Sequence, residues 1–234
     1  MKSRKFLAAL CGFLLSLAAA IAVLAFLVDG MGGSAPLMRS LMERYAPVEA
    51  TGLPGEHYPA MAEMITDYLS GREQIFQFCF ADEAGIDRLC FHDDEQQHMA
   101  DCKALFDLCR MVLLFAVLAV LLLGGCCWLL RDGKRYIARG ALWGSLAVLA
   151  VVAALAVWGL VDFDGLFVLF HQLSFANDLW LLDPRTDLLI RLMPLSFFTG
   201  LGLRGVGLFV PIVLMTEIAA RLLCRAGRAG AQPD

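Results

Sequence analysis

The chain has 234 residues, of which 59% are hydrophobic, and its mean hydropathy is +0.69. Soluble globular domains are roughly half apolar, so this composition argues against a soluble enzyme and indicates segments that lie in a membrane. The formal net charge of -4 is distributed without a basic outer surface, which argues against nucleic acid as a partner.

Four apolar runs are long enough to cross a bilayer as helices. They cover approximately residues 6–28, 111–130, 141–161 and 199–223. A hydrocarbon layer of about 30 Å requires about 20 residues of helix, and only helices or closed barrels satisfy the backbone in lipid. Because the runs are continuous rather than alternating, we expect an all-α membrane protein with four transmembrane helices.

The first run follows Lys2, Arg4 and Lys5, as the core of a signal peptide would. Signal-peptide cores are about 7–15 residues long and end at a cleavage site with small residues. This run is longer, and Ala25–Val28 offers no such site. The pattern therefore favours an uncleaved membrane anchor over a cleaved leader.

The charges between the runs predict the orientation of the chain. The N-terminus, residues 131–139 and residues 221–234 are basic. Residues 29–110 hold 15 acidic against 6 basic residues, and residues 162–198 hold 5 against 2. Because basic loops stay in the cytoplasm, we expect both termini inside and the two acidic segments outside the membrane.

The first outer segment, residues 29–110, is expected to form a small and mainly helical lobe. Apolar residues recur at helical spacing in residues 35–45 and 58–69, which predicts two short helices. Cysteines on this side of the membrane can form disulfides, but their spacing leaves the pairing open. The four in this segment are Cys79, Cys90, Cys102 and Cys109.

A longer helix is expected to begin at Asp93 or Asp94 and to continue into the second span. Each aspartate is followed three residues later by a glutamine, which is a capping-box pattern. Asp94, His98 and Asp101 are separated by four and three residues, so the helix places them on one face.

The second outer segment, residues 162–198, is too polar for a span and is rich in aromatic residues. Asp162–Gly165 predicts a turn, residues 166–173 form an apolar stretch that contains His171, and Asp183–Asp187 predicts the start of a short helix. The aromatic side chains suit the headgroup layer of a membrane. We therefore expect an interfacial or re-entrant loop.

Two of the four histidines, His98 and His171, flank membrane spans. Composition alone favours His171 as an interfacial residue bonded to a backbone carbonyl, whereas a tertiary approach to His98 would form a site. Asp94, His98, Asp101 and His171 are also acceptable metal ligands, although no compact His-x-x-x-His motif is present. Arg204, in the outer turn of the fourth span, suits lipid phosphates and a substrate pocket equally.

The sequence lacks the signatures of common hydrolases and nucleotide enzymes. It contains no Gly-x-Ser-x-Gly, no Walker A sequence and no His-x-x-x-x-Asp acyltransferase box. A Ser-His hydrolase or a nucleotide-dependent enzyme is therefore not indicated.

Several strings in the two outer segments carry a resemblance to a known family. In the second segment they are Phe170-His171-Gln172-Leu173-Ser174-Phe175, Asn177-Asp178-Leu179-Trp180, Asp183-Pro184-Arg185-Thr186-Asp187-Leu188-Leu189-Ile190, Pro194 and Phe197-Phe198. In the first they are Tyr68-Leu69-Ser70-Gly71 and Glu95-Gln96-Gln97-His98-Met99-Ala100-Asp101-Cys102-Lys103. With these residues the chain resembles the bacterial lipoprotein intramolecular transacylases, a family of four-span membrane proteins. Cys102 stands where that family usually has an apolar residue.

The resemblance covers the whole chain and implies an acyl transfer. The substrate would be a bacterial lipoprotein whose N-terminal cysteine carries an S-linked diacylglyceryl group. The sn-2 acyl chain would move to the α-amine of the same cysteine and give the lyso form, an N-acyl S-monoacylglyceryl lipoprotein. No cofactor, metal or nucleotide is implied, and the active site would lie on the outer face of the cytoplasmic membrane.

The resemblance assigns the activity to His98 and His171. One would accept the proton of the α-amine, and the other would donate to the departing glycerol oxygen or the oxyanion; the sequence leaves the assignment open. Asp101 would orient or charge-stabilise His98. The candidates for substrate binding or support are Asn177, Trp180, Arg191, Tyr68 and Arg204.

Two alternatives remain from the sequence. The protein would be a non-catalytic membrane binding or assembly protein if its acidic lobe engages an envelope protein, or a metal-dependent membrane hydrolase if the histidines and aspartates hold a metal ion. Membrane lipid is a partner under each of these hypotheses, and the sequence gives no oligomeric state.

Overall fold

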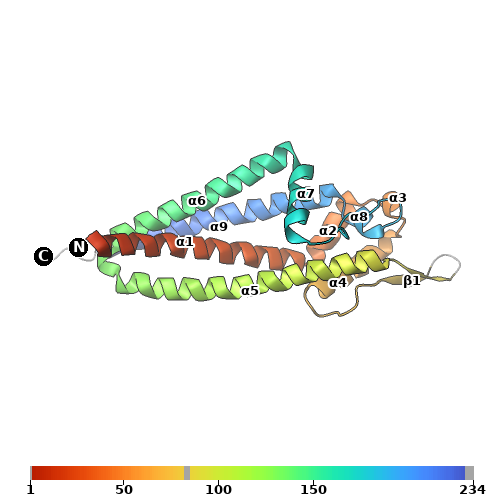
Figure 1. Cartoon of the computed structure of the whole chain (residues 1–234), viewed down its shortest axis with the longest axis horizontal. Coiled ribbons are helices and arrows are strands. Elements are labelled where there is room, and N and C mark those ends of the chain that lie inside the picture. Colours follow the sequence, from red (N-terminus) through yellow and green to blue (C-terminus); the bar gives the residue numbers. More distant parts are fainter. Residues whose placement is uncertain (1, 82–84, 230–234) are drawn as a thin grey trace. The chain divides into compact units, whose positions relative to one another are not determined.

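A computed structural model describes residues 2–81 and 85–229, without the side chains of residues 132, 219, 220 and 222–229. Helices dominate the fold (Figure 1). In chain order the elements are α1 (Lys2–Gly32), α2 (Ala35–Tyr45), α3 (Val48–Thr51), η1 (Gly55–His57), α4 (Tyr58–Leu69), β1 (Cys79–Ala81), β2 (Asp87–Leu89), α5 (Asp93–Leu129), η2 (Arg131–Gly133), α6 (Lys134–Val161), α7 (Phe163–Ser174), α8 (Leu188–Leu192) and α9 (Leu195–Ala229).

Among the described residues, four helices have the length and hydropathy to cross a membrane. They are α1, α5, α6 and the part of α9 from Leu195 to Ile218. Each contains all or most of one of the predicted apolar runs, because a continuous run of apolar side chains on a helix covers the backbone on every side. The prediction of a helical membrane protein with four spanning helices is confirmed.

The chain divides into two compact units. The span unit contains Met1–Leu27, Arg110–Val157 and Val206–Asp234, and the lobe contains Val28–Cys109 and Trp158–Gly205. The lobe is therefore built from two stretches of sequence that the second and third spans separate.

Within the span unit, glycines allow α1 and α6 to pack closely. A Cβ atom on Gly140 would collide with the backbone carbonyl of Ala9, and one on Gly144 would collide with the Ser16 hydroxyl and crowd the Phe13 carbonyl. Small residues four positions apart are typical of tight helix contacts in membranes.

The lobe has one hydrophobic core, to which both outer segments contribute. In Figure 1, α2, α3 and α8 lie close together, and helix α8 places Leu188, Leu189 and Leu192 in the same core as α2 and α4. The core residues with no or almost no exposed surface are Leu41, Met42, Leu53, Met61, Ala62, Ile65, Leu192 and Phe197.

A short antiparallel hairpin precedes α5. Strand β1 pairs with β2 in the register Cys79↔Leu89, and residues 82–84, between them, lie outside the described residues. Within the described part of the chain, no disulfide joins the four cysteines of the first outer segment, Cys79, Cys90, Cys102 and Cys109.

Helix α5 is capped differently from the prediction. It begins at Asp93, but the capping acceptor is Glu95, whose Oε2 accepts the His92 N–H at 2.8 Å. The other carboxylate oxygen accepts the Leu189 N–H at 2.7 Å. The glutamines of the predicted capping box are not used, because the carboxylate of Glu95 reaches the first turns of both α5 and α8.

The second outer segment forms two helices. Asp162 caps α7, since its side chain accepts the Gly165 N–H at 2.8 Å. The helix predicted to start within Asp183–Asp187 begins later, at Leu188. The Asp187 carboxylate accepts the Asp183 N–H at 2.6 Å and holds these residues as a turn.

Glu95 is completely buried. Its replacement tests how much the two hydrogen bonds that its carboxylate accepts stabilise the lobe. Glu95→Gln should lower the free energy of unfolding by about 1–3 kcal/mol, because one buried N–H would then face an amide nitrogen that cannot accept. Thermal or denaturant unfolding in detergent micelles measures the change. As a control, Glu43→Gln removes an exposed pair with Arg39 and should change stability by less than about 0.5 kcal/mol. Equal effects would contradict this role of Glu95.

Candidate functional site

The structure brings His98 and His171 together within the lobe. His98 lies on the second turn of α5 and His171 on the last turn of α7. Their ring centroids are 6.1 Å apart, and each residue keeps only 7% of its surface exposed. The first 18 residues of α5, Asp93–Arg110, carry seven charged side chains, so His98 lies outside the apolar run of that helix.

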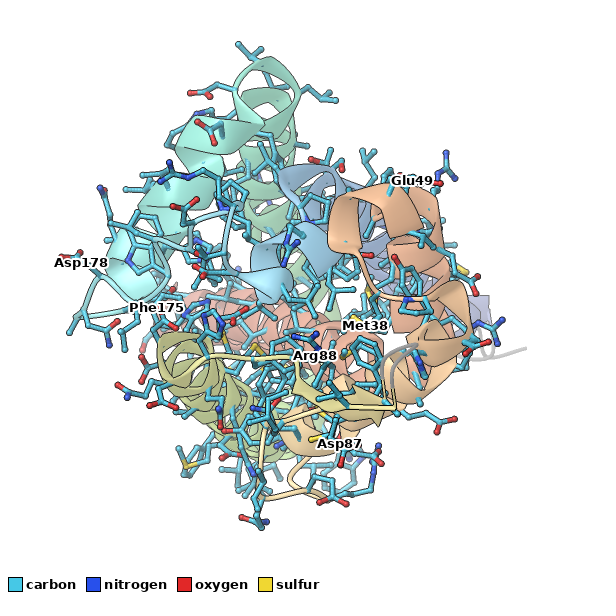
Figure 2. The ribbon with its side chains drawn as sticks, turned by 90° about the vertical axis from the view of Figure 1, so that its right-hand side faces the viewer. Met38, Glu49, Asp87, Arg88, Phe175 and Asp178 are labelled. Atoms are coloured by element: carbon cyan, nitrogen blue, oxygen red, sulfur yellow. The ribbon has the colours of Figure 1, made fainter. Side chains whose placement is uncertain are left out.

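Aromatic rings enclose the two imidazoles. The Phe175 ring lies 5.1 Å from that of His98 and 5.5 Å from that of His171. Trp180 lies 5.0 Å from His171 with the rings 34° apart, and Phe167 lies 4.1 Å from it. Figure 2 shows Phe175 beside α7. These rings exclude water from the imidazoles, which matters for their charge.

One hydrogen bond fixes the tautomer of His171. Its Nδ1 lies 2.8 Å from the backbone oxygen of Phe167, one turn earlier in α7. A carbonyl oxygen only accepts, so Nδ1 carries the hydrogen and Nε2 has the free lone pair in the neutral ring. Burial lowers the pKa of His171, and the carbonyl acts in the opposite direction. The ring is therefore a neutral base at physiological pH.

His98 is held neutral even more strongly. Burial lowers its pKa to about 4, the neighbouring His171 adds to the decrease, and Asp101 acts against it. Its Nε2 lies 3.6 Å from the Sγ atom of Cys102, whose pKa burial raises to about 12. Among the described residues, His98 Nδ1 has no hydrogen-bond partner although it is buried. This imidazole therefore has unused hydrogen-bonding capacity inside the site.

Asp101 and Asn177 connect the two elements that carry the imidazoles. The Asn177 amide donates to the Asp101 carboxylate at 2.8 Å. The amide oxygen of Asn177 also accepts the Leu179 N–H at 3.1 Å, which shapes the loop after α7. No hydrogen bond joins Asp101 to His98 within the described part of the chain; Asp101 acts on the ring through its charge and through the loop.

The remaining predicted residues lie in different surroundings. Trp180 stacks on His171, as described above. Arg191 donates through Nε to the backbone oxygen of Asp187 at 3.1 Å, and Tyr68 packs on Phe76 in the lobe core at 5.2 Å. For Arg204, the described residues provide no hydrogen bond or ion pair. The structure thus groups Asp101, Asn177 and Trp180 with the imidazoles, and gives Tyr68 and Arg191 packing and backbone partners.

A cluster of potential metal ligands differs from the predicted set. The side chains of His92, Asp94 and Glu95 approach one another within 4.8 Å, without His98 or His171. Both oxygens of Glu95 already accept backbone N–H groups, and Asp94 accepts the Glu95 N–H at 2.9 Å. Bonds to backbone N–H groups at the start of α5 account for Asp94 and Glu95, and the His92 ring lies 3.9 Å from the Asp187 carboxylate.

Four contributors to the site were absent from the predicted set. Cys102 and Phe167 lie four residues from His98 and His171 on the same helices, so helical spacing is a signal that identifies them. Phe175 is also four residues from His171, but it lies just after the last residue of α7, so the spacing signal applies to it only through the bond of its N–H to the His171 carbonyl. Glu95 is a carboxylate in a sequence rich in exposed acids, and no local pattern marks its burial.

The arrangement suits acid-base chemistry on an apolar substrate. A neutral imidazole accepts a proton at one nitrogen and donates a hydrogen bond at the other. In a site enclosed by aromatic rings, such donors act in a low local dielectric and stabilise developing charge more than they would in water. The same rings offer apolar contacts to an acyl chain.

Comparisons with known proteins identify the family and the fold of the chain. A family model described as Lipoprotein intramolecular transacylase Lit matches residues 13–198, which is most of the chain. A search of curated proteins gave no match.

Three solved structures with the same fold are forms of the lipoprotein intramolecular transacylase Lit from Bacillus cereus. The first shares 19% identity with a TM-score of 0.71 and covers 99% of this chain and 100% of that one. A variant with one histidine replaced by arginine shares 17% identity with a TM-score of 0.74, covering 96% and 95%. A variant with a histidine replaced by alanine shares 20% identity with a TM-score of 0.62, covering 92% and 91%.

The family match covers both outer segments, most of α1 and the whole of α5 and α6, and the solved structures share the fold over almost the full length of both chains. The chain therefore belongs to the lipoprotein intramolecular transacylase (Lit) family of integral membrane acyltransferases that act on lipoproteins.

Proposed function

We propose that this protein moves the sn-2 acyl chain of a diacylglyceryl-modified lipoprotein to the α-amine of the same N-terminal cysteine, with His98 and His171 as the catalytic pair. The observation that carries this proposal is the approach of two buried imidazoles, with ring centroids 6.1 Å apart, inside an aromatic enclosure. Family membership supports the reaction class.

The chemistry of the substrate requires a base. An α-amine has a pKa of about 7.7–8 and attacks an ester only when it is neutral. The Nε2 atom of His171 is available for its proton, because Nδ1 is already bonded to the Phe167 carbonyl. We therefore assign His171 as the general base.

His171 alone carries the proton through the reaction. The amine nitrogen bonds to the ester carbonyl carbon while His171 Nε2 takes a proton from the amine. The bond between that carbon and the glycerol oxygen then breaks, and His171 returns the proton to the oxygen. His98, with a pKa of about 4, is neutral throughout; an N–H of its ring donates to the oxyanion instead of giving up its proton.

The rest of the enzyme supplies position and apolar contact. Amine and ester belong to one molecule, so holding them in near-attack geometry accounts for much of the rate enhancement. Loop charge supports a site on the outer face of the bacterial cytoplasmic membrane, because both segments that form the lobe are acidic. In this orientation the lobe, which contains both imidazoles, lies on the same face of the membrane as the lipoproteins and lipid that it would contact.

Replacing each histidine by glutamine separates the two roles. His171→Gln removes the base and should abolish the lyso product, whereas His98→Gln keeps an N–H donor and should retain more activity than His98→Ala. Mass spectrometry of lipoprotein N-termini, in a bacterial host without its own N-acylation, measures the product. His57→Gln, outside the site, serves as the control. Full activity of His171→Gln would contradict the assignment, and unchanged diacylglyceryl termini with the well-expressed parent protein would contradict the reaction.

The protonation states are testable directly. Burial lowers both pKa values. His98, with a pKa of about 4, should stay neutral at pH 6, where an ordinary histidine of pKa near 6.5 is mostly charged, and His171 should be less protonated there than an ordinary histidine. NMR titration of labelled histidines in micelles should give a midpoint of about 4 for His98 and one below the ordinary value for His171. The NMR signals of the two rings are assigned from the spectra of His98→Gln and His171→Gln, each of which lacks one signal. A midpoint at or above 6.5 for either ring would contradict its burial in the active enzyme.

The bond between Asp101 and Asn177 should position the imidazoles. Asn177→Asp places two carboxylates against each other and should reduce kcat/KM by about 10-fold, which corresponds to about 1.4 kcal/mol. Adding Asp101→Asn to this variant exchanges the donor and the acceptor and should recover most of the lost kcat/KM. The parent, the two single variants and the double variant form a double-mutant cycle, and kinetics on a synthetic diacylglyceryl peptide measure all four. Additive losses would show that the two residues act independently.

A further inference from the structure

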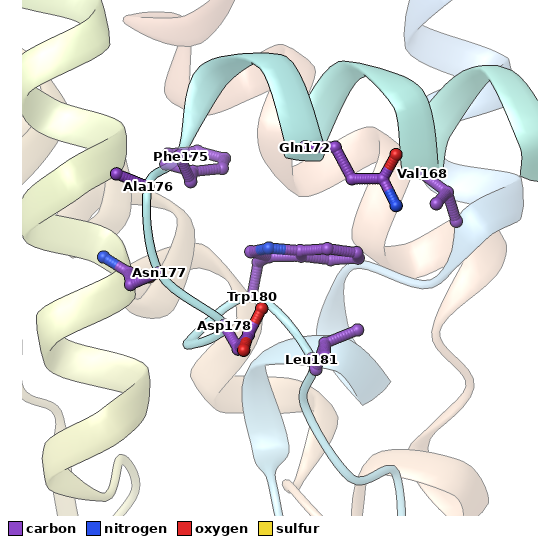
Figure 3. A pocket seen from close by; sticks show the side chains of 8 residues that line it. All are labelled: Val168, Gln172, Phe175, Ala176, Asn177, Asp178, Trp180 and Leu181. Carbon is purple, nitrogen blue, oxygen red and sulfur yellow. The ribbon is translucent and has the colours of Figure 1, made fainter.

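A second feature of the lobe lies directly beside the imidazoles. It is a pocket of about 450 Å³ between α7 and the loop that follows it. Figure 3 shows the Trp180 ring inside it, with Gln172 on the side of α7 and Asp178 and Leu181 on the opposite side. Its lining includes Gln172, Phe175, Asn177, Asp178, Trp180 and Leu181.

The pocket shares two walls with the catalytic pair. Trp180 faces His171 at 5.0 Å and Phe175 faces His98 at 5.1 Å, and both rings also line the pocket. A group that reaches past either ring from the imidazoles therefore enters this space.

The proposed substrate has such a group. The α-amine that reacts and the carbonyl that continues the polypeptide are attached to the same Cα atom of the cysteine. With the amine at His171, the following residues leave the site within a few ångströms of it, and each residue spans up to about 3.6 Å. The acyl chains require apolar surroundings, whereas the polypeptide requires a polar exit.

The polar groups of the pocket are suited to a peptide. The Asn177 amide is engaged with Asp101, but within the described part of the chain the side chains of Gln172 and Asp178 have no hydrogen-bond partner. Asp178 is exposed, and no basic residue lines the pocket. Figure 2 shows Asp178 at the outer edge of the lobe. Its carboxylate attracts a cation and repels an anion.

We propose that this pocket binds the residues that follow the lipid-modified cysteine, and that Asp178 makes the enzyme prefer a basic side chain there over an acidic one. The inference rests on the proposed transacylase function and deepens it. Gln172 supplies an amide to the peptide backbone, and Trp180 separates the polypeptide from the reacting ester. Because the two outer segments together hold 20 acidic against 8 basic residues, the surrounding charge acts in the same direction as Asp178.

Synthetic diacylglyceryl-cysteine peptides that differ only at residues two to four test this inference. Three series carry lysine, serine or glutamate there, and the full-length enzyme acts on them in vesicles of phosphatidylcholine, which has no net charge. Mass spectrometry of the lyso product gives kcat/KM. We expect lysine to exceed glutamate by about fivefold, as befits one partly exposed charge pair. Asp178→Asn should reduce this ratio to about one, and Asp178→Lys should invert it.

The control is Asp164→Asn, which removes an exposed carboxylate on α7 that does not line the pocket; the lysine-to-glutamate ratio should then stay near the parent value. An active enzyme with equal ratios in the parent and Asp178→Asn would overturn the inference and leave the proposed function intact. If Asp178→Asn lowered kcat/KM equally on all three peptides, the inference would also be overturned, and a lipid headgroup would be indicated as the occupant of the pocket. No product from any peptide with the parent enzyme would overturn the proposed function itself.

Discussion

The lobe depends on a carboxylate that has no water around it. Glu95 is completely buried and accepts one N–H at the start of α5 and another at the start of α8. Helix N-termini expose donors that the helix itself cannot satisfy, and a single side chain here satisfies one from each helix. Because α5 carries His98 and α8 contributes to the lobe core, this carboxylate connects the helix that bears His98 to the core of the lobe.

Burial also sets the charge of the site. Two imidazoles in water would share a mixture of protonated states near neutral pH. Here the aromatic rings remove water, and each imidazole makes a positive charge on the other less favourable, so the neutral pair is the ground state. In the proposed mechanism the substrate amine loses a proton to a neutral base. Packing keeps the imidazoles neutral, and among the described residues no acidic side chain is hydrogen-bonded to either ring, in contrast to the aspartate of serine hydrolases.

Local patterns predicted the elements better than the contacts between them. The apolar runs located the four spanning helices, since length and hydropathy are local properties. The shared core of the two outer segments was not predictable, because it joins α8 to α2 and α4, which two spanning helices separate in the sequence. Asn177 and Asp101 are 76 residues apart, and no spacing rule reaches that far. The use of Glu95 as the cap was missed because the pattern contained two glutamines at equally suitable positions.

The hydrogen bond inside α7 has a consequence for how the enzyme admits its substrate. The tautomer of His171 is fixed by a hydrogen bond to the Phe167 carbonyl, one turn earlier in the same helix, and not by a side chain on another element. A rigid displacement of α7, of the size needed to let two acyl chains pass, would leave that bond unbroken. In the proposed mechanism, the tautomer of the base is therefore fixed before the lipoprotein arrives and does not depend on how the substrate enters the site.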